Sequence, residues 1–168
     1  MKGAVAAIAI LVSLAAQTTL SNVLSRGGTS IDLVLIVVVY IAIKSGAVTG
    51  LLAGTVAGLI QDALSSGVLG IGGLAKTIVG FLAGVLGTQF IVTAPLPRFL
   101  LLVLGTVLQT AIVMGVYTLL NLRQFTLAYP QIAGQALGNA FVGVIGFQLI
   151  EWFPGFVDRR RAGRFLKR

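Results

Sequence analysis

Residues that could carry acid, base or nucleophilic chemistry are scarce in this sequence. The chain has 168 residues with no cysteine and no histidine, and its acidic residues are Asp32, Asp62, Glu151 and Asp158. Thiol catalysis, imidazole catalysis and a metal site built from several side chains therefore lack their usual groups. Proteolysis within the membrane would need a serine paired with a lysine, and no lysine stands in a recognisable nucleophile setting. We expect no catalytic residue, no metal and no cofactor.

The charged residues with the most informative spacing end two rows of glycines. The first glycine row comprises Gly46, Gly50, Gly54, Gly58 and then Asp62, and the second comprises Lys76, Gly80 and Gly84. A step of four residues turns an α-helix by about 400°, so each row follows one helix face with a slow drift. Small residues at this spacing let two helices in a bilayer approach closely. Each row therefore predicts a helix-packing face or a contact with a partner protein.

The short segment between the two rows predicts an antiparallel hairpin of two helices. In such a hairpin, Asp62 and Lys76 would lie near each other in the outer third of the bilayer and could form an ion pair. A charged side chain that faces lipid costs at least about 2.5 kcal/mol at mid-membrane, which favours pairing. The alternative is that Asp62 only caps the turn from Ser65 to Gly67 near the membrane surface.

The elements that position these residues are predicted to be membrane-spanning helices. Hydrophobic residues make up 57% of the chain, charged residues make up 10%, and the mean hydropathy is +1.05. Because a span needs about 20 mostly apolar residues, the sequence predicts an all-α membrane protein with six spans over residues 1–154. The predicted spans are Gly3–Val23, Ser30–Lys44, Ala47–Leu64, Leu74–Thr93, Phe99–Leu122 and Ala133–Phe153.

The second and third predicted spans are shorter than the ideal length. Helix tilt, local thinning of the bilayer, or side chains of Asp32 and Lys44 that reach toward the headgroups would compensate. At the end of the sixth span, Pro154 is predicted to stop the helix. The remaining residues, 155–168, then form a basic tail.

The basic residues predict the orientation of the chain. If the N-terminus is cytoplasmic, nine basic residues fall in inside segments and three in outside segments. Such an excess is typical of the cytoplasmic side, so both termini are predicted to lie there and the net charge of +8 is not assigned to nucleic-acid binding. A cleavable signal peptide ending near Ser13 to Ala15 is the alternative, but the apolar run continues past that point.

Half of the basic residues lie in the tail. They are Arg159, Arg160, Arg161, Arg164, Lys167 and Arg168. Each could add up to about 1 kcal/mol of attraction to anionic lipid, and a contact with a cytoplasmic partner is a further possibility. Setting the topology of the last span would explain most of this charge without either contact.

Polar side chains also follow the last two predicted spans. The fifth span carries Thr106, Gln109, Thr110 and Tyr117, and the sixth carries Gln131, Gln135 and Asn139. Hydrogen bonds between helices would explain them, at about 0.6 to 2 kcal/mol each. A cavity for a small molecule would also need such groups, provided that they converge.

Taken together, these features resemble the rod shape-determining protein MreD family over nearly the whole chain. The central stretch GLIQDALSSGVLGIGGLAKTIVGFLAG carries the matching positions Gly58, Leu59, Asp62, Ser65, Gly67, Leu69, Gly70, Gly80 and Gly84. Weaker similarity lies at Gln17 to Leu20 and at Ile31 to Leu35. Two positions depart from the family pattern, because Ile31 replaces a proline and Lys76 replaces an aromatic residue.

The resemblance implies a non-enzymatic subunit of the machinery that builds the lateral cell wall, located in the bacterial cytoplasmic membrane. It implies MreC as a partner, together with MreB, RodA and a class B penicillin-binding protein. It also implies a compact bundle similar to the substrate-binding components of energy-coupling-factor transporters. The alternative function is therefore vitamin binding in a transporter, with Asp62, Lys76, Gln135 and Asn139 around an outward pocket.

Overall fold

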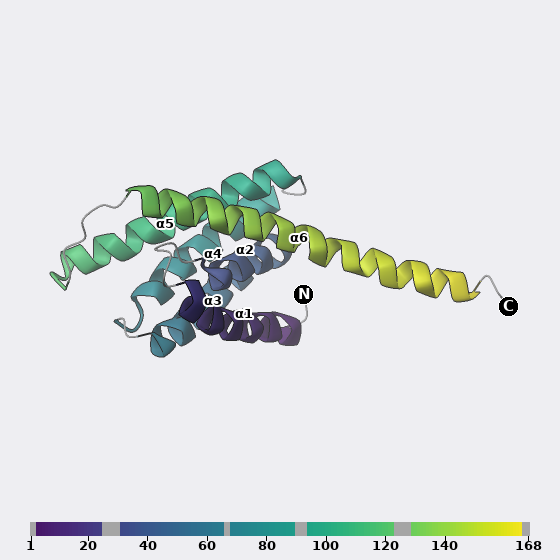
Figure 1. Cartoon of the computed structure of the whole chain (residues 1–168), viewed down its shortest axis with the longest axis horizontal. Helices are drawn as coiled ribbons and strands as arrows, with labels where there is room; N and C mark the ends of the chain where they lie inside the picture. The colour runs from purple at the N-terminus through teal and green to yellow at the C-terminus, as the bar shows by residue number, and fades with distance from the viewer. Residues whose placement is uncertain (1–2, 25–30, 66–67, 90–93, 123–128, 166–168) are drawn as a thin grey trace.

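The computed structural model describes residues 3–24, 31–65, 68–89, 94–122 and 129–165, with the helical backbone alone for 20–24 and 153–165. All regular structure within these ranges is helical, as predicted. The helices are α1 (Gly3–Leu24), α2 (Leu33–Ser45), α3 (Ala47–Leu64), α4 (Ile71–Gln89), α5 (Pro95–Leu119) and α6 (Tyr129–Phe165). Figure 1 shows them gathered in one bundle, from which the second half of α6 projects.

Four of the helices are long and apolar enough to cross a membrane. They are α3, α4, α5 and the part of α6 from Tyr129 to Trp152. The apolar stretch of α1 and the whole of α2 are shorter. Helix α2 has 13 residues and therefore a length of about 20 Å, less than the hydrocarbon thickness of roughly 30 Å. The prediction of six spans is thus supported by length and composition for four helices.

Helix α2 is short because both of its ends are fixed by the local sequence. Asp32 precedes its first turn, and the Asp32 carboxylate accepts a hydrogen bond from the backbone N–H of Leu35. Gly46 follows its last turn with a φ of +90°, a conformation that glycine adopts without steric cost. The chain turns there and begins α3 at once.

The prediction that Pro154 ends the last helix is wrong, because α6 continues to Phe165. Proline removes one backbone hydrogen bond and disfavours a helix interior by about 3 kcal/mol, but this cost does not force termination. The proposed boundary between residues 154 and 155 therefore falls inside a helix.

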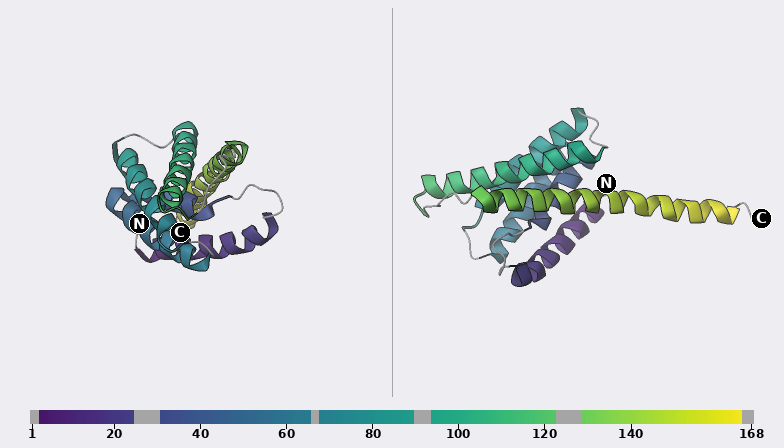
Figure 2. Two further views of the ribbon diagram at one scale, coloured as in Figure 1. Left: turned by 90° about the vertical axis from the view of Figure 1, so that its left-hand side faces the viewer. Right: turned by 45° about the horizontal axis from the view of Figure 1, so that its top comes forward.

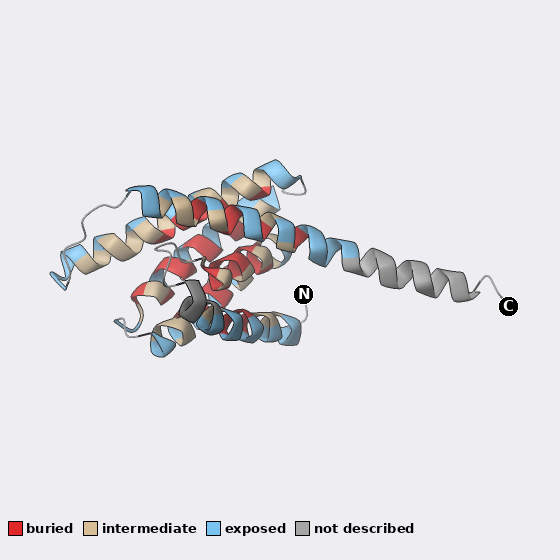
Figure 3. Ribbon diagram, viewed as in Figure 1, coloured by how far each residue is buried: buried red, intermediate tan, exposed pale blue. Residues whose placement is uncertain are grey.

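The bundle has a mostly apolar core, as a water-soluble protein does, but its outer surface is also rich in large apolar side chains. Large apolar side chains such as Leu11, Val48, Leu104 and Phe141 are exposed on the outside. Several polar or charged side chains, among them Asp32, are buried. Figure 3 shows the buried residues concentrated where the helices meet. This distribution suits a surface that faces lipid rather than water.

Helices α2 and α4 form the centre of the bundle. Helix α4 packs against α2, α3 and α5, and α2 also contacts α1 and α6. Figure 2 shows α1 lying obliquely across the other helices instead of alongside them. As a result, part of α2 stays uncovered between α1 and α6.

Candidate functional site

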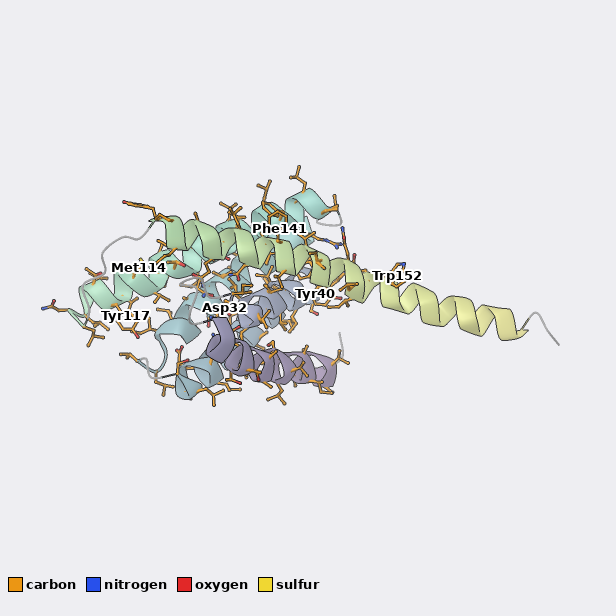
Figure 4. All side chains as sticks on the ribbon, viewed as in Figure 1. Asp32, Tyr40, Met114, Tyr117, Phe141 and Trp152 are labelled. Atoms are coloured by element: carbon orange, nitrogen blue, oxygen red, sulfur yellow. The ribbon has the colours of Figure 1, made fainter. Side chains whose placement is uncertain are left out.

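A buried ion pair between α2 and α4 is the centre of the most polar region. The Lys76 ammonium lies 2.8 Å from Oδ2 of Asp32, and the two side chains are 4% and 7% exposed. Figure 4 shows Asp32 in the middle of the bundle. Removing two charges from water is expensive, so a pair of this kind persists only where further hydrogen bonds satisfy the remaining polar atoms.

Side chains from α5 and α6 supply those hydrogen bonds. Gln109 donates its Nε2 to Oδ2 of Asp32 over 2.8 Å. Asn139 accepts the backbone N–H of Asp32 with its Oδ1 at 2.8 Å and donates its Nδ2 to the Thr106 hydroxyl at 3.1 Å. We call Asp32, Lys76, Thr106, Gln109 and Asn139 the buried cluster. The buried cluster joins α2, α4, α5 and α6. Thr106, Gln109 and Asn139, three of the polar residues noted in the fifth and sixth predicted spans, therefore form hydrogen bonds between helices.

Helix α1 reaches the same region through one glutamine. Gln17 donates its Nε2 to the backbone carbonyl of Ile31 over 2.8 Å and accepts the backbone N–H of Leu33 at 2.7 Å. These two peptide groups flank Asp32 on either side. The amide of Gln17 therefore fixes the chain at the point where α2 begins.

The predicted ion pair between Asp62 and Lys76 is wrong. Lys76 bonds to Asp32, whereas Oδ2 of Asp62 accepts the backbone N–H groups of Gly70 and Gly73 at 2.9 and 3.0 Å. The N-terminus of α4 carries partial positive charge and unpaired N–H groups, which stabilise the Asp62 carboxylate without a basic side chain. Asp62 caps the N-terminus of α4. Of the turn from Ser65 to Gly67, which the alternative assigned to Asp62, residues 66 and 67 lie outside the described residues.

The expectation that Asp32 reaches toward the headgroups is also wrong, because its side chain is directed into the bundle. Lys76 could pair with Asp32 or with Asp62, and the number of residues that separates each from Lys76 does not decide between them. The decisive feature is that α4 packs against α2 and α3 at once. Its Lys76 side chain then meets Asp32 at the start of α2.

The two glycine rows lie where α3 and α4 touch. A Cβ atom on Gly50 would collide with the Gly80 carbonyl, and one on Gly54 would collide with the Lys76 carbonyl. A Cβ on Gly58 would lie 2.5 Å from Cα of Gly73. The rows are therefore occupied by contacts within this chain, and a separate protein cannot also occupy that face. Thr55 and Thr77 add a hydroxyl hydrogen bond of 2.8 Å between the same helices.

Gly46, the first residue of the first glycine row, behaves differently from the rest. Gly46 lies in the turn between α2 and α3, and a Cβ there would meet only Thr88 at an ordinary distance of 3.8 Å. Its positive φ, rather than close packing, requires glycine. Gly84 lies against Ala47 at the first residue of α3.

A second charged cluster lies at the other end of α2 and was not predicted. Arg98 donates two hydrogen bonds to Glu151, of 2.8 and 2.9 Å, and the Lys44 ammonium lies 2.6 Å from Oε1 of the same carboxylate. The Arg98 side chain is 5% exposed, Glu151 is 35% exposed and Lys44 is 40% exposed. We call these three residues the Glu151 cluster. Its signal in the sequence was a lone acid near the end of the last span.

Two apolar grooves open between the helices. The α1/α3 groove has a volume of about 350 Å³, and its lining includes the small residues Gly3, Ala6, Ala7, Thr49 and Ala53. The α1/α2/α6 groove has a volume of about 510 Å³, and its lining includes Val5, Ala16, Tyr40, Val142, Phe147 and Ile150. Both grooves present almost no polar atoms.

The residues proposed for a vitamin pocket do not gather around one polar cavity within the described ranges. Asp62 caps α4, while Lys76 and Asn139 bond to Asp32. Gln135 is half-buried one turn before Asn139. The tail side chains Arg159, Arg160, Arg161, Arg164, Lys167 and Arg168 lie outside the part of the structure whose side chains are described.

Comparison with known proteins identifies the family of the chain. No curated protein and no solved structure matches it. The family model described as rod shape-determining protein MreD matches residues 2–152, which include the buried cluster, both glycine rows and the Glu151 cluster. Since this match covers most of the 168 residues, the chain belongs to the MreD family of rod shape-determining membrane proteins.

Proposed function

We propose that this protein is a non-enzymatic scaffold of the bacterial cell-wall elongation complex and that it binds MreC. The observation that carries this proposal is the family match over residues 2–152. The geometry of the interior supports it. The charged groups of the buried cluster bond to one another, as a structural core does, and leave the lipid-facing surface for recognition of partners.

A transmembrane helix of MreC is proposed to dock in the α1/α3 groove. The glycine rows themselves are covered by the contact between α3 and α4, so they are not available to MreC. Helix association in lipid depends on close packing, which small side chains permit. The α1/α3 groove offers such side chains from both of its helices, including Ala6, Ala7 and Thr49.

The proposed topology has six spans in the cytoplasmic membrane. Both termini lie on the cytoplasmic side. Helices α1 and α2 would complete the crossing together with their flanking residues, aided by tilt and local thinning of the bilayer. The oblique position of α1 agrees with tilt. MreB, RodA and a class B penicillin-binding protein are proposed as further members of the assembly, and the basic tail as a contact for anionic lipid or for MreB.

Affinity purification from native membranes tests the scaffold role, with partners identified by mass spectrometry. Wild-type protein is expected to copurify with MreC. Retention of a vitamin-sized molecule in place of MreC would instead favour the transporter alternative.

Two exposed alanines of α1 form a matched test of the groove. Ala7 lines the α1/α3 groove, whereas Ala4 lines neither groove described above. The Ala7→Leu variant is expected to lower the amount of copurified MreC at least about fivefold, since inserted bulk in a packed contact costs roughly 1 to 3 kcal/mol. Ala4→Leu should behave as wild type. Equal MreC recovery with both variants would remove this groove from the proposal.

A further inference from the structure

The α1/α2/α6 groove has dimensions that fit one leaflet of a bilayer. Its lining extends from Val5 to Ala16 on α1 and from Val142 to Ile150 on α6. At 1.5 Å per residue these segments are about 16 and 12 Å long, close to half of the hydrocarbon thickness of roughly 30 Å. A hydrocarbon chain of one leaflet has about this length.

One end of this groove carries excess positive charge. Tyr40 of α2 and Ile150 of α6 line the groove. Lys44 lies four residues after Tyr40, and Glu151 directly follows Ile150. The Glu151 cluster contains two basic groups and one acid. Arg98 donates two hydrogen bonds to the Glu151 carboxylate, so this carboxylate does not depend on Lys44 for its charge partner.

Lys44 is the member of this cluster that can reach a ligand. Its side chain is 40% exposed, and an ammonium has three N–H donors, of which the bond to Glu151 uses one. Trp152 is 64% exposed on the next residue of α6, and indole side chains concentrate where hydrocarbon meets headgroups. Figure 4 shows Trp152 where α6 leaves the bundle.

We propose that the α1/α2/α6 groove is a binding site for an anionic phospholipid. One acyl chain lies in the groove against α2, and the phosphate accepts hydrogen bonds from Lys44. Basic groups between transmembrane helices bind lipid phosphates in this way. The charge selects an anionic headgroup over a zwitterionic one, and the apolar wall selects a chain over a soluble phosphate.

The site can be tested with the full-length chain in nanodiscs of equal parts phosphatidylglycerol and phosphatidylcholine. Lipids that stay bound on release are counted by native mass spectrometry. Wild-type protein is expected to retain phosphatidylglycerol in preference to phosphatidylcholine. Lys44→Ala should lower this preference about fivefold, because one basic group near the headgroup contributes roughly 1 kcal/mol of attraction to an anionic lipid. Lys44→Arg should restore it.

Two glycines with open space around them provide the matched test of the groove itself. A Cβ at either Gly146 or Gly115 would meet nothing within 4 Å, and of the two Gly146 alone lines this groove. Gly146→Leu, with Val142→Trp as a second groove-filling variant, should remove the retained lipid. Gly115→Leu should keep it.

Three results would overturn the proposal. The first is equal retention of both lipids by wild-type protein. The second is retention of phosphatidylglycerol by both groove-filling variants. The third is loss of MreC from these variants with no change in bound lipid. The last result would assign the groove to a partner helix. Failure of wild-type protein to bind MreC would leave the lipid site standing, because the two measurements are independent.

Discussion

Asp32 and Glu151 each bind a lysine from another helix, but they do so in different surroundings. Asp32 and Lys76 are almost fully buried among apolar helices, whereas Glu151 and Lys44 are more than a third exposed. The Coulomb attraction within the buried pair is weakly screened, and leaving one of these charges without its partner is costly. Water and ions moderate both effects at Glu151. The same chemistry therefore stabilises the core at one site, whereas at the other it leaves the paired ammonium of Lys44 partly exposed to a ligand.

The largest effect is expected from Lys76→Met. This change leaves the Asp32 carboxylate buried without its counter-charge, and breaking such a pair typically costs about 3 to 5 kcal/mol. Thermal unfolding in a mild detergent measures the loss. In the double variant Asp32→Asn with Lys76→Met, the charge is absent and the introduced asparagine can still cap α2, so stability should partly return. A double variant no more stable than the single one would show that the buried charge is not the source of the cost.

Arg98→Met is expected to have the next largest effect, on the other side of the comparison. It removes two charge-assisted hydrogen bonds to Glu151, and bonds to charged groups contribute about 1.5 to 3 kcal/mol. Since Glu151 keeps Lys44 and contact with water, the loss should be smaller than that of Lys76→Met. Unfolding in the same detergent provides the comparison. The reverse order would contradict the view that burial sets the cost.

Asn139→Leu tests the hydrogen bonds that surround the buried ion pair. The backbone N–H of Asp32 loses its acceptor, and an unsatisfied buried donor costs about 1 to 3 kcal/mol. Gln148→Leu on the exposed face of α6 is the control. Hydrogen exchange at the start of α2 should rise in the Asn139 variant alone. Unchanged exchange would mean that Asn139 does not hold this segment.

Lys44→Ala is expected to have the smallest effect on stability, about 0.2 to 1 kcal/mol, as for other exposed ion pairs. Raising the salt concentration from roughly 0.1 to 1 M should reduce the difference from wild type further, because it shortens the Debye length from about 10 to 3 Å. The same change in salt should leave the effect of Lys76→Met nearly intact. Equal salt dependence of the two variants would remove the contrast between the clusters.

Much of the fold could be predicted from composition and glycine spacing. Apolar runs broken by glycine, proline and charged residues predicted the six helices approximately. The first glycine row follows α3 from Gly50 onward, as its period requires, and begins at Gly46 in the preceding turn. The prediction for Pro154 failed because a local preference of a few kcal/mol does not by itself end a helix. The family resemblance rested on the same central stretch, and the match over residues 2–152 confirms it.

The sequence by itself determined that this is an all-helical membrane protein whose α3 and α4 can approach without side chains between them, because both properties depend on residue type and local period. Only the tertiary structure decided that Lys76 bonds to Asp32 and that Asp62 caps α4. That choice depends on which helices are neighbours around the bundle, since charges far apart in sequence meet only where packing places them. The position of α1 likewise decided where the surface opens into grooves, because its angle to the bundle is set by contacts with α2 and α3 and not by its own apolar sequence.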